Sequence, residues 1–584
     1  MAVYRSDQAQ FTFAPEAGHG GYPEAATAVS GGSLGTAVIN MASGLKAGSR
    51  HITVDSLSGV TAGEYILIGA GGTEETEVRR VEYVDGSTSL TLDAPTAFFH
   101  PDNDTVRVIE SVTEATTDKF ISWVPGVYET VDTPDPEMAI EGRYLLGVGQ
   151  KRNFLQAYKG QQTFSGSVGS FVLLNGWPLR FPIGKINSIP VGGVGSATTS
   201  IDGDYTDATD ANGARKGDYV INVDSASGIA PGDLIAIGYN ATPTASTNTE
   251  IRRIITESST SIRLNYPLQF DHADNTDIHK ITEGSVTNYQ HDIFETVDLD
   301  TMSWNVHMRD SGETAANDFN RRWFGGHCGS MSISADEGGL LTAGWDSVTF
   351  QDMVHNQKLH SVYASGAGNG LPGHALMQQI SSPDIGVPAK SGSDVTAAHG
   401  GFPSTEPYYF SQGSLTIHGV EFARVRNFSL SVSNAEEPRY YINNQGKGTR
   451  RHRGPSEIRE NQREYSMSAS IALPDSVGAT TSSRAIFKEL ILEGDYGTDT
   501  PGTANASDGM SGFAVTLTFT RATNDTITIT IPNDGTAAEG AGEQGAFIRS
   551  APHGITGDNP LQTDVDILFR NMKIQIKDSE PFYP

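Results

Sequence analysis

The sequence predicts an all-β protein, mainly strands with one short α-helix, and three observations support this fold class. Sixty-five glycines and 27 prolines in 584 residues exceed the average share and favour a chain with many turns. Several segments of strand length alternate apolar and polar residues, as half-buried strands do. A stretch of β character also occurs twice. At about 150 residues per domain, the length predicts three to five domains.

The duplicated stretch predicts two small β domains inserted in the chain. Residues 54–69 (VDSLSGVTAGEYILIG) and 223–238 (VDSASGIAPGDLIAIG) are identical at nine of 16 positions. TEVRRV at Thr76 then matches TEIRRI at Thr249, and HPDN at His100 matches HADN at His272, in the same order. Such regular spacing over about 60 residues indicates a true repeat. We expect copy 1 at 45–111 and copy 2 at 213–285, with a linker over 191–213.

The C-terminal part predicts a β-sandwich or barrel with one helix packed on it. Alternation of apolar and small polar residues predicts strands at 428–432, 465–473, 513–519, 526–531 and 565–569. Four apolar residues at helical spacing predict a helix over 482–493, and Gly494 follows as a stop. Residues 353–406 lose this pattern, so we expect a long loop there, with room for a short helix at 374–380.

Residues 407–584 resemble the tail tube, or major tail, proteins of long-tailed double-stranded DNA viruses. The segments that carry the resemblance are 407–442 (PYYFSQGSLTIHGVEFARVRNFSLSVSNAEEPRYYI), 463–475 (REYSMSASIALPD), 544–569 and, upstream, 319–346. They are patterns of fold and assembly and contain no catalytic signature. The resemblance implies a tail-tube β-sandwich or barrel over 286–584.

A second, diverged copy of that domain is expected at 1–44 and 112–212. Residues 121–147 can be laid beside 415–442, and 164–169 beside 465–470. In the family that the chain resembles, duplicated members form trimeric rings and single-domain members form hexameric rings. The resemblance therefore implies rings of this chain itself, with a trimer favoured over a hexamer. The rings would stack into a hollow tube through which viral DNA passes without specific binding.

The net charge of the chain argues against some classes of binding partner. Sixty-nine Asp and Glu against 40 Lys and Arg give a net charge of −29. This balance argues against binding to nucleic acids, which needs basic residues to neutralise phosphates. It also argues against binding to an anionic membrane surface. No apolar run is long enough to insert into a membrane, and the N-terminus has no signal pattern. Only 13 lysines and many acids are typical of proteins hydrated in concentrated salt, as in a virus of a halophilic archaeon; the alternative is an ordinary acidic protein.

One segment departs from this acidity. Residues 445–463 (QGKGTRRHRGPSEIRENQR) contain only two acids and six basic residues, namely Lys447, Arg450, Arg451, Arg453, Arg459 and Arg463. We expect a long hairpin loop that contacts an acidic surface of a neighbouring subunit, because opposite charges help to fix register. Two alternatives are a loop that faces DNA in the channel and a solvated loop.

Three other groups of residues could form a metal or catalytic site, but their patterns favour neither. Calcium loops need closely spaced oxygen ligands, but the spacing of four acids fails the EF-hand pattern, so a solvated linker is favoured at Asp202, Asp204, Asp207 and Asp210. The repeated His-x-Asp-Asn at His100–Asp102 and His272–Asp274 favours a turn over a metal or acid–base pair.

His327 and Cys328 are poorly placed for nucleophilic catalysis, because adjacent strand residues point to opposite faces. Cys328 is the only cysteine, which excludes an intramolecular disulfide and a Cys-rich zinc site. We expect no catalytic residue, no metal and no cofactor.

The sequence therefore predicts a structural virion protein of the viral tail, assembled in the host cytoplasm, with other tail proteins at the tube ends. The alternative is a surface adhesin or receptor-binding virion protein built from acidic β domains. A carbohydrate-active enzyme would need paired carboxylates in an aromatic cleft, and no such pair is identifiable.

Overall fold

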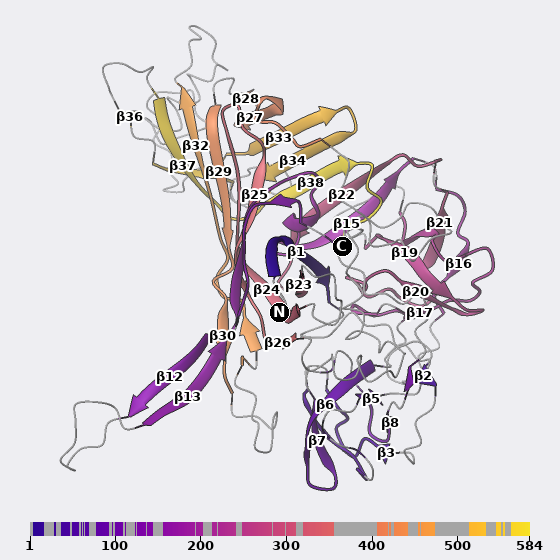
Figure 1. Ribbon diagram of the computed structural model, residues 1–584. Coiled ribbons are helices and arrows are strands. Elements are labelled where there is room, and N and C mark those ends of the chain that lie inside the picture. The colour runs from indigo at the N-terminus through magenta and orange to yellow at the C-terminus, as the bar shows by residue number, and fades with distance from the viewer. Residues whose placement is uncertain are drawn as a thin grey trace, which may run out of the picture.

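The computed structural model is built almost entirely of antiparallel β-sheets (Figure 1). It describes residues 4–583 with gaps, the larger ones at 17–28, 31–36, 69–76, 113–122, 144–155, 203–212, 241–247, 311–318, 356–405, 442–453, 473–512, 533–544 and 555–561. Strands hold 59% of the described residues, and no helix of seven or more residues occurs among them. The mainly β prediction is confirmed. The helix expected at 482–493 and the loop at 353–406 fall largely or wholly outside the described residues.

The largest sheet has 13 strands and gathers segments from the whole length of the chain. Its main path, in spatial order, is β10 (Val127–Tyr128), β14 (Ser165–Val172), β25 (Thr342–Thr349), β24 (Phe319–Asp336), β29 (Val425–Ser433), β32 (Glu464–Ala472), β37 (Gln562–Phe569) and β35 (Phe547–Ser550). Off this path lie β1 (Tyr4–Pro15), β11 (Val131–Asp132), β23 (Met302–Asp310), β26 (Asp352–His355) and β36 (His553–Gly554).

Strand β24 joins two parts of this sheet. Its first half pairs with β23 and β26, and its second half pairs with β25 and β29. The change of partners follows Gly325, whose φ of +64° lies in the left-handed region that favours glycine. A Cβ at Gly326 would lie 2.4 Å from the Phe350 ring and 2.6 Å from the Met302 carbonyl oxygen, so the strands approach too closely there for a side chain.

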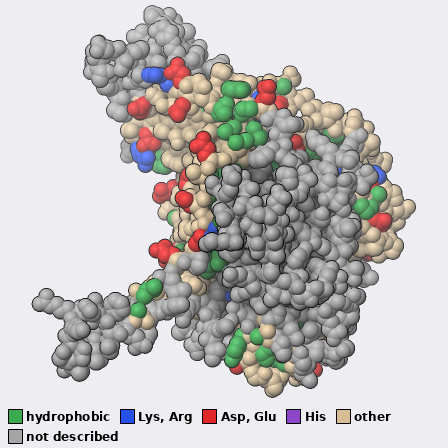
Figure 2. Space-filling view, in the orientation of Figure 1, with side chains coloured by type: hydrophobic (Ala, Val, Ile, Leu, Met, Phe, Trp, Pro, Cys, Tyr) green, Lys and Arg blue, Asp and Glu red, His purple; other side chains and the backbone are tan. Residues whose placement is uncertain are grey.

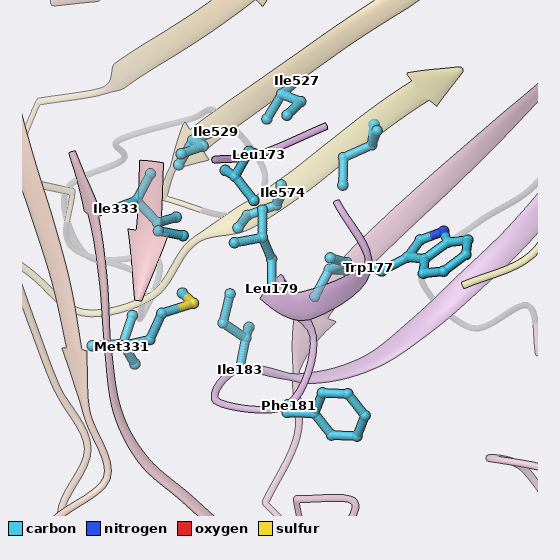
Figure 3. Close-up of a cluster of buried hydrophobic side chains, with 14 of the residues drawn as sticks. Leu173, Trp177, Leu179, Phe181, Ile183, Met331, Ile333, Ile527, Ile529 and Ile574 are labelled. Atoms are coloured by element: carbon cyan, nitrogen blue, oxygen red, sulfur yellow. The ribbon is translucent and has the colours of Figure 1, made fainter. Parts of the chain in front are cut away.

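A seven-stranded sheet packs against the first one. Its order is β15 (Gly184–Val191), β22 (Asn288–Glu295), β38 (Lys573–Asp578), β34 (Asp525–Ile531), β33 (Val515–Ala522), β27 (Gly413–Ile417) and β28 (Val420–Glu421). Figure 3 shows Met331 and Ile333 of the first sheet facing Ile527, Ile529 and Ile574 of the second, with Leu173, Trp177, Leu179 and Ile183 beside them. The described helical elements are short 3₁₀ turns, η1 (Trp177–Leu179) in this core and η4 (Phe410–Gln412).

Two hairpin arms extend from the 13-stranded sheet. The first is β12 (Glu137–Arg143) with β13 (Gln156–Thr163), and the second is β30 (Glu437–Arg439) with β31 (Glu457–Arg459). Each arm lies in sequence between two strands that pair with each other, β11 and β14 for the first and β29 and β32 for the second. The arms touch, because the Tyr440 hydroxyl donates to the Gln162 carbonyl oxygen at 3.0 Å.

The two copies of the repeat form six-stranded sheets with corresponding strand orders. Copy 1 follows β3 (Ala37–Val38), β8 (Thr105–Val108), β5 (Tyr65–Ile68), β6 (Glu77–Asp85), β7 (Ser89–Leu92) and β4 (His51–Thr53). Copy 2 follows β16 (Thr199–Ser200), β21 (Asp277–Ile281), β18 (Leu234–Ile237), β19 (Glu250–Glu257), β20 (Ser261–Leu264) and β17 (Val220–Asn222). Strands β3 and β16 lie before residues 45 and 213, where we expected the copies to begin. The pair β2 (Val29–Ser30) and β9 (Ser111–Val112) adjoins copy 1 in the chain.

Copy 2 is fastened to the body of the protein. Leu234, Ala236 and Ile251 belong to the main hydrophobic core, whereas the alternate residues Ile235 and Ile237 belong to the domain's own core. The Tyr266 hydroxyl donates to the Tyr583 carbonyl oxygen at 2.9 Å. The sequence of copy 1 has Ala94 at the position of Tyr266. This tether is therefore specific to copy 2.

We predict that Leu234→Ala destabilises the whole body of the protein and not copy 2 alone. Leu234 is 1% exposed and faces the main core, so its truncation should lower the free energy of unfolding by about 2–5 kcal/mol. Val191→Ala on β15, where the side chain is 46% exposed, is the control and should change it by less than about 0.5 kcal/mol. Denaturant unfolding followed by tryptophan fluorescence measures both; an unchanged main transition in Leu234→Ala contradicts the shared core.

Candidate functional site

Serine is the commonest residue at the centre of the face of the 13-stranded sheet that points away from the core. Every second residue is serine at the centre of three neighbouring strands, namely Ser330, Ser332 and Ser334 of β24, Ser429, Ser431 and Ser433 of β29, and Ser466, Ser468 and Ser470 of β32. The alternate residues, such as Met331, Leu430 and Met467, are buried in the core. Strand alternation therefore places an apolar layer on one side and a hydroxyl layer on the other.

The serines are aligned from strand to strand. One row runs Thr342, Ser334, Ser429, Ser468 and Asp566 across five strands. The next runs Gly344, Ser332, Ser431, Ser466 and Leu568, and a third runs Ser347, Ser330, Ser433 and Glu464. These three rows contain the carboxylates of Asp566 and Glu464 and no Lys or Arg, but Arg549 of the adjoining strand β35 donates to Asp566 Oδ2 at 2.7 Å.

Neighbouring hydroxyls bond to one another across the strands. Ser431 Oγ lies 2.7 Å from Ser466 Oγ, and Ser334 Oγ lies 3.2 Å from Thr342 Oγ1. Ser332 donates to Asp346 Oδ1 at 3.2 Å. Figure 2 shows Asp and Glu side chains in red, with a few Lys and Arg side chains in blue, along the left margin, where this sheet runs in Figure 1. The hydroxyls in these contacts are bonded to other groups of the same face.

This face is chemically suited to passing a polyanion without holding it. Serine is too short to enclose a phosphate, and the Glu464 carboxylate repels one, whereas the Asp566 carboxylate is paired with Arg549. Affinity for DNA comes mainly from Lys and Arg on phosphates, which the three rows lack. We did not identify this face from the sequence, although its signal, Ser-x-Ser-x-Ser in three segments, is visible there (SMSIS, SLSVS and SMSAS).

The basic segment lies where the hairpin was expected. Strands β30 and β31 pair as a hairpin, which places Arg459 of the segment on β31 and Arg463 just after it. Lys447, Arg450, Arg451 and Arg453 lie outside the described residues. Arg459 is exposed; its Nε donates to Glu457 Oε1 at 2.9 Å, and its guanidinium lies 5.9 Å from the centre of the Tyr441 ring.

Arg463 differs from this expectation because its guanidinium is occupied within the chain. It donates to Asn434 Oδ1 at 2.6 Å and to the Ile183 carbonyl oxygen at 3.0 Å, and it lies 3.3 Å from a carboxylate oxygen of Glu295. Its side chain is 11% exposed. These bonds tie the root of the arm to the body, so Arg463 acts here as an internal anchor. The sequence offers no sign of this, because the partners come from three distant segments.

The acidic stretch near Asp202 is described only at its start. The Asp202 backbone N–H donates to the Asn222 carbonyl oxygen at 3.1 Å, whereas Asp204, Asp207 and Asp210 lie outside the described residues. Within the described part of the chain, no group of three His, Cys, Asp or Glu residues could hold a metal ion.

The repeated His-x-Asp-Asn forms the turn that we expected. Asn103 and Asn275 have φ values of +70° and +63°, in the left-handed region that Asn tolerates. His100 and His272 sit in backbone bridges to Leu45 and Ala214. Their side chains meet different carboxylates, Asp104 Oδ2 at 2.9 Å and Glu250 Oε1 at 3.0 Å.

Glu250 is the centre of a buried charged cluster in copy 2. Burial alone would raise the pKa of Glu250, but the charge of Arg252 and the hydrogen bond from His272 outweigh it and bring the pKa to about 2. The Arg252 guanidinium also bonds the Tyr266 hydroxyl at 3.1 Å and the Pro267 carbonyl oxygen at 2.8 Å. The cluster therefore joins buried residues within copy 2 by hydrogen bonds and ion pairs. Copy 1 has Glu77, Arg79 and His100 at the corresponding sequence positions.

Cys328 is unsuited to nucleophilic chemistry. It is buried, and burial raises the pKa of its thiol well above the usual value, with nearby Glu436 and Asp346 adding to the rise. A thiolate, the reactive form, is therefore disfavoured. The imidazole of His327 faces a carboxylate: its Nδ1 lies 3.5 Å from Glu460 Oε1.

Ser188, His291 and Asp578 superficially resemble a hydrolase triad. Ser188 Oγ lies 2.9 Å from His291 Nδ1, and His291 Nε2 lies 3.5 Å from Asp578 Oδ1. All three are buried, and the Tyr583 ring stacks on the imidazole at 3.8 Å between centroids. His291 Nε2 also lies 2.8 Å from the Glu580 carbonyl oxygen. These contacts fasten the C-terminal segment and leave the serine no substrate-facing side.

No helix among the described residues is long and apolar enough to cross a membrane. The sequence matches no protein-family model and no curated protein. A function for this chain therefore rests on its own residues and their geometry.

Proposed function

We propose that this protein is the tail tube subunit of a long-tailed double-stranded DNA virus, with the serine-rich face lining the channel. The observation that carries the proposal is the three aligned rows of hydroxyls and carboxylates on a wide antiparallel sheet. A channel for DNA needs a continuous surface that does not bind phosphate. No catalytic role is part of the proposal.

The two strand–arm–strand units support a duplicated tube domain. The first unit is β11, the arm β12–β13 and β14; the second is β29, the arm β30–β31 and β32. The two units overlap the segments whose sequences resemble each other, 121–147 with 415–442 and 164–169 with 465–470. Two tube domains per chain favour a ring of three chains over a ring of six. The tail-tube sandwich with its helix at 482–493 is part of the same proposal.

The arms would join stacked rings through the basic loop, and the two six-stranded domains would decorate the outside. The subunit would assemble in the host cytoplasm, become part of the virion tail and meet other tail proteins at the tube ends. The surplus of acids fits a halophilic archaeal host, where salt screens the charge of −29.

Electron microscopy of the purified, polymerised protein tests this function. We expect stacked rings with a central channel, and mass measurement of isolated rings should give three chains. Isolated spikes would favour the adhesin alternative and overturn the tube. Rings of six chains would remove the duplication argument but leave the tube.

We predict that Ser332→Lys with Ser431→Lys makes the channel adhere to DNA. The two residues are register partners at the centre of the face, so the new ammonium groups would meet passing phosphates. Binding of assembled tubes to duplex DNA should appear at low salt and fall with a log–log slope of about −0.9 per phosphate neutralised. Ser332→Asn with Ser431→Asn adds bulk without charge and should stay inert. Assembled lysine tubes that release DNA as freely as the parent would count against the channel assignment.

We predict that changing Arg450, Arg451 and Arg453 to Glu leaves the monomer folded but weakens polymerisation. One exposed ion pair contributes only about 0–1 kcal/mol, but a ring system repeats each contact many times. Sedimentation measures assembly, and circular dichroism checks folding. The control variant has the same three residues changed to Lys. It keeps the positive charge but lacks the forked donor geometry of arginine, so it distinguishes the effect of charge from that of geometry. Normal polymerisation of the Glu variant would exclude the loop from subunit contacts.

A further inference from the structure

Two carboxyl groups face the root of the second arm. Glu436 immediately precedes β30 and Glu460 immediately follows β31, so the pair flanks the base of the hairpin. Both carboxylate oxygens of Glu436 are hidden from solvent. The group is pressed against β24, since a Cβ at Gly329 would lie 3.1 Å from Glu436 Oε2.

The surrounding groups are mostly acidic or neutral. His327 and Cys328 approach from β24 and Thr349 from β25, and Asp346 lies near Cys328. Glu460 Oε1 accepts the Leu299 backbone N–H at 3.2 Å and lies 3.5 Å from His327 Nδ1. The arginines at the root are paired with other carboxylates, Arg463 with Glu295 at 3.3 Å and Arg439 with Glu437 at 2.5 Å.

One side of the root is fixed by the body. The Asn434 side-chain amide donates to the carbonyl oxygens of Pro182 and Cys328 at 3.0 and 2.8 Å. The chain then turns at Ala435, whose φ is +45°, before it reaches Glu436. The arm thus leaves the body at a sharp corner, and the two carboxyl groups lie at that corner.

Burial raises the pKa of Glu436 well above its usual value, and the nearby charge of Glu460 raises it further, while a hydrogen bond with Thr349 opposes the rise. An ionised Glu436 would be a buried negative charge beside a second one. Such a charge is costly unless a cation or strong donors compensate it.

We propose that Glu436 and Glu460 form a proton-dependent latch that holds the second arm against the body. With Glu436 protonated, the root stays closed. Loss of the proton sets two carboxylates against each other across the base and loosens the arm. The latch itself does not depend on the tube; only its effect on assembly rests on the proposed function.

The sign of the pH effect follows from linkage. Because the folded pKa of Glu436 is raised, its stabilising contribution is fully present below the unfolded value and is lost as pH rises through the folded value. The equilibrium for opening the root should increase by up to about tenfold per pH unit within that window. Glu436→Gln imitates the protonated acid, so it should remove this dependence and keep the arm closed at high pH.

Hydrogen–deuterium exchange on the unassembled full-length chain tests the latch at one fixed salt concentration across a pH series. Exchange rates, corrected for intrinsic pH dependence, should rise with pH at the amides of Glu437, Arg439 and residues 457–459 in the parent. They should stay flat in Glu436→Gln. Glu457→Gln is the control on the same arm; Glu457 is exposed and bonds Arg459, so this variant should behave as the parent.

Three outcomes would overturn the latch. The first is equal pH dependence in the parent and Glu436→Gln, and the second is a flat profile in both. A profile that follows the identity of the salt cation rather than pH would assign the compensation to a bound cation and also reject the latch. Sedimentation of assembled protein is measured separately, so a failure of tube formation leaves the exchange result interpretable.

Discussion

The packing of two apolar sheet faces against each other is the constraint on which the body depends. Met331, Leu430 and Met467 must all point inward at once, on three strands that are far apart in sequence. A slip of one residue in any of them would bury serines and expose the core residues, because the side-chain period of a strand is two. The register is therefore strongly specified, and the aligned hydroxyl rows follow directly from it.

The same core also holds the elements around it. Copy 2 contributes one face of its sheet to the core, and the C-terminal segment is fastened through Tyr583, which accepts from Tyr266 and bonds Asp578. Arg463 and Asn434 tie the root of the second arm to Ile183 and Pro182 at the edge of the core. Each appended part is thus attached by polar bonds at the boundary of an apolar interior.

Local pattern predicted much of this fold. Alternation identified the strands around Phe428, Tyr465 and Thr526, and spacing identified the repeat with its turn at Asn103 and Asn275. Partners distant in sequence could not be predicted, such as β1 with β23 or the bonds of Arg463, because pairing across hundreds of residues leaves no local signal. The hairpin beneath the basic loop was predictable. The serine face was visible as a pattern, but its meaning required the neighbouring strands in register.

The hydroxyl rows have a mechanical consequence. Neighbouring strands lie about 4.8 Å apart, and successive residues on one face lie about 6.8 Å apart, so the serines form a fine, even lattice. Some of its hydroxyls are bonded to one another. In the proposed channel, a long molecule that slides over this face would meet many small, similar contacts whose energies average out along its length. Friction would then be low because the spacing of the contacts is finer than the molecule that moves across them.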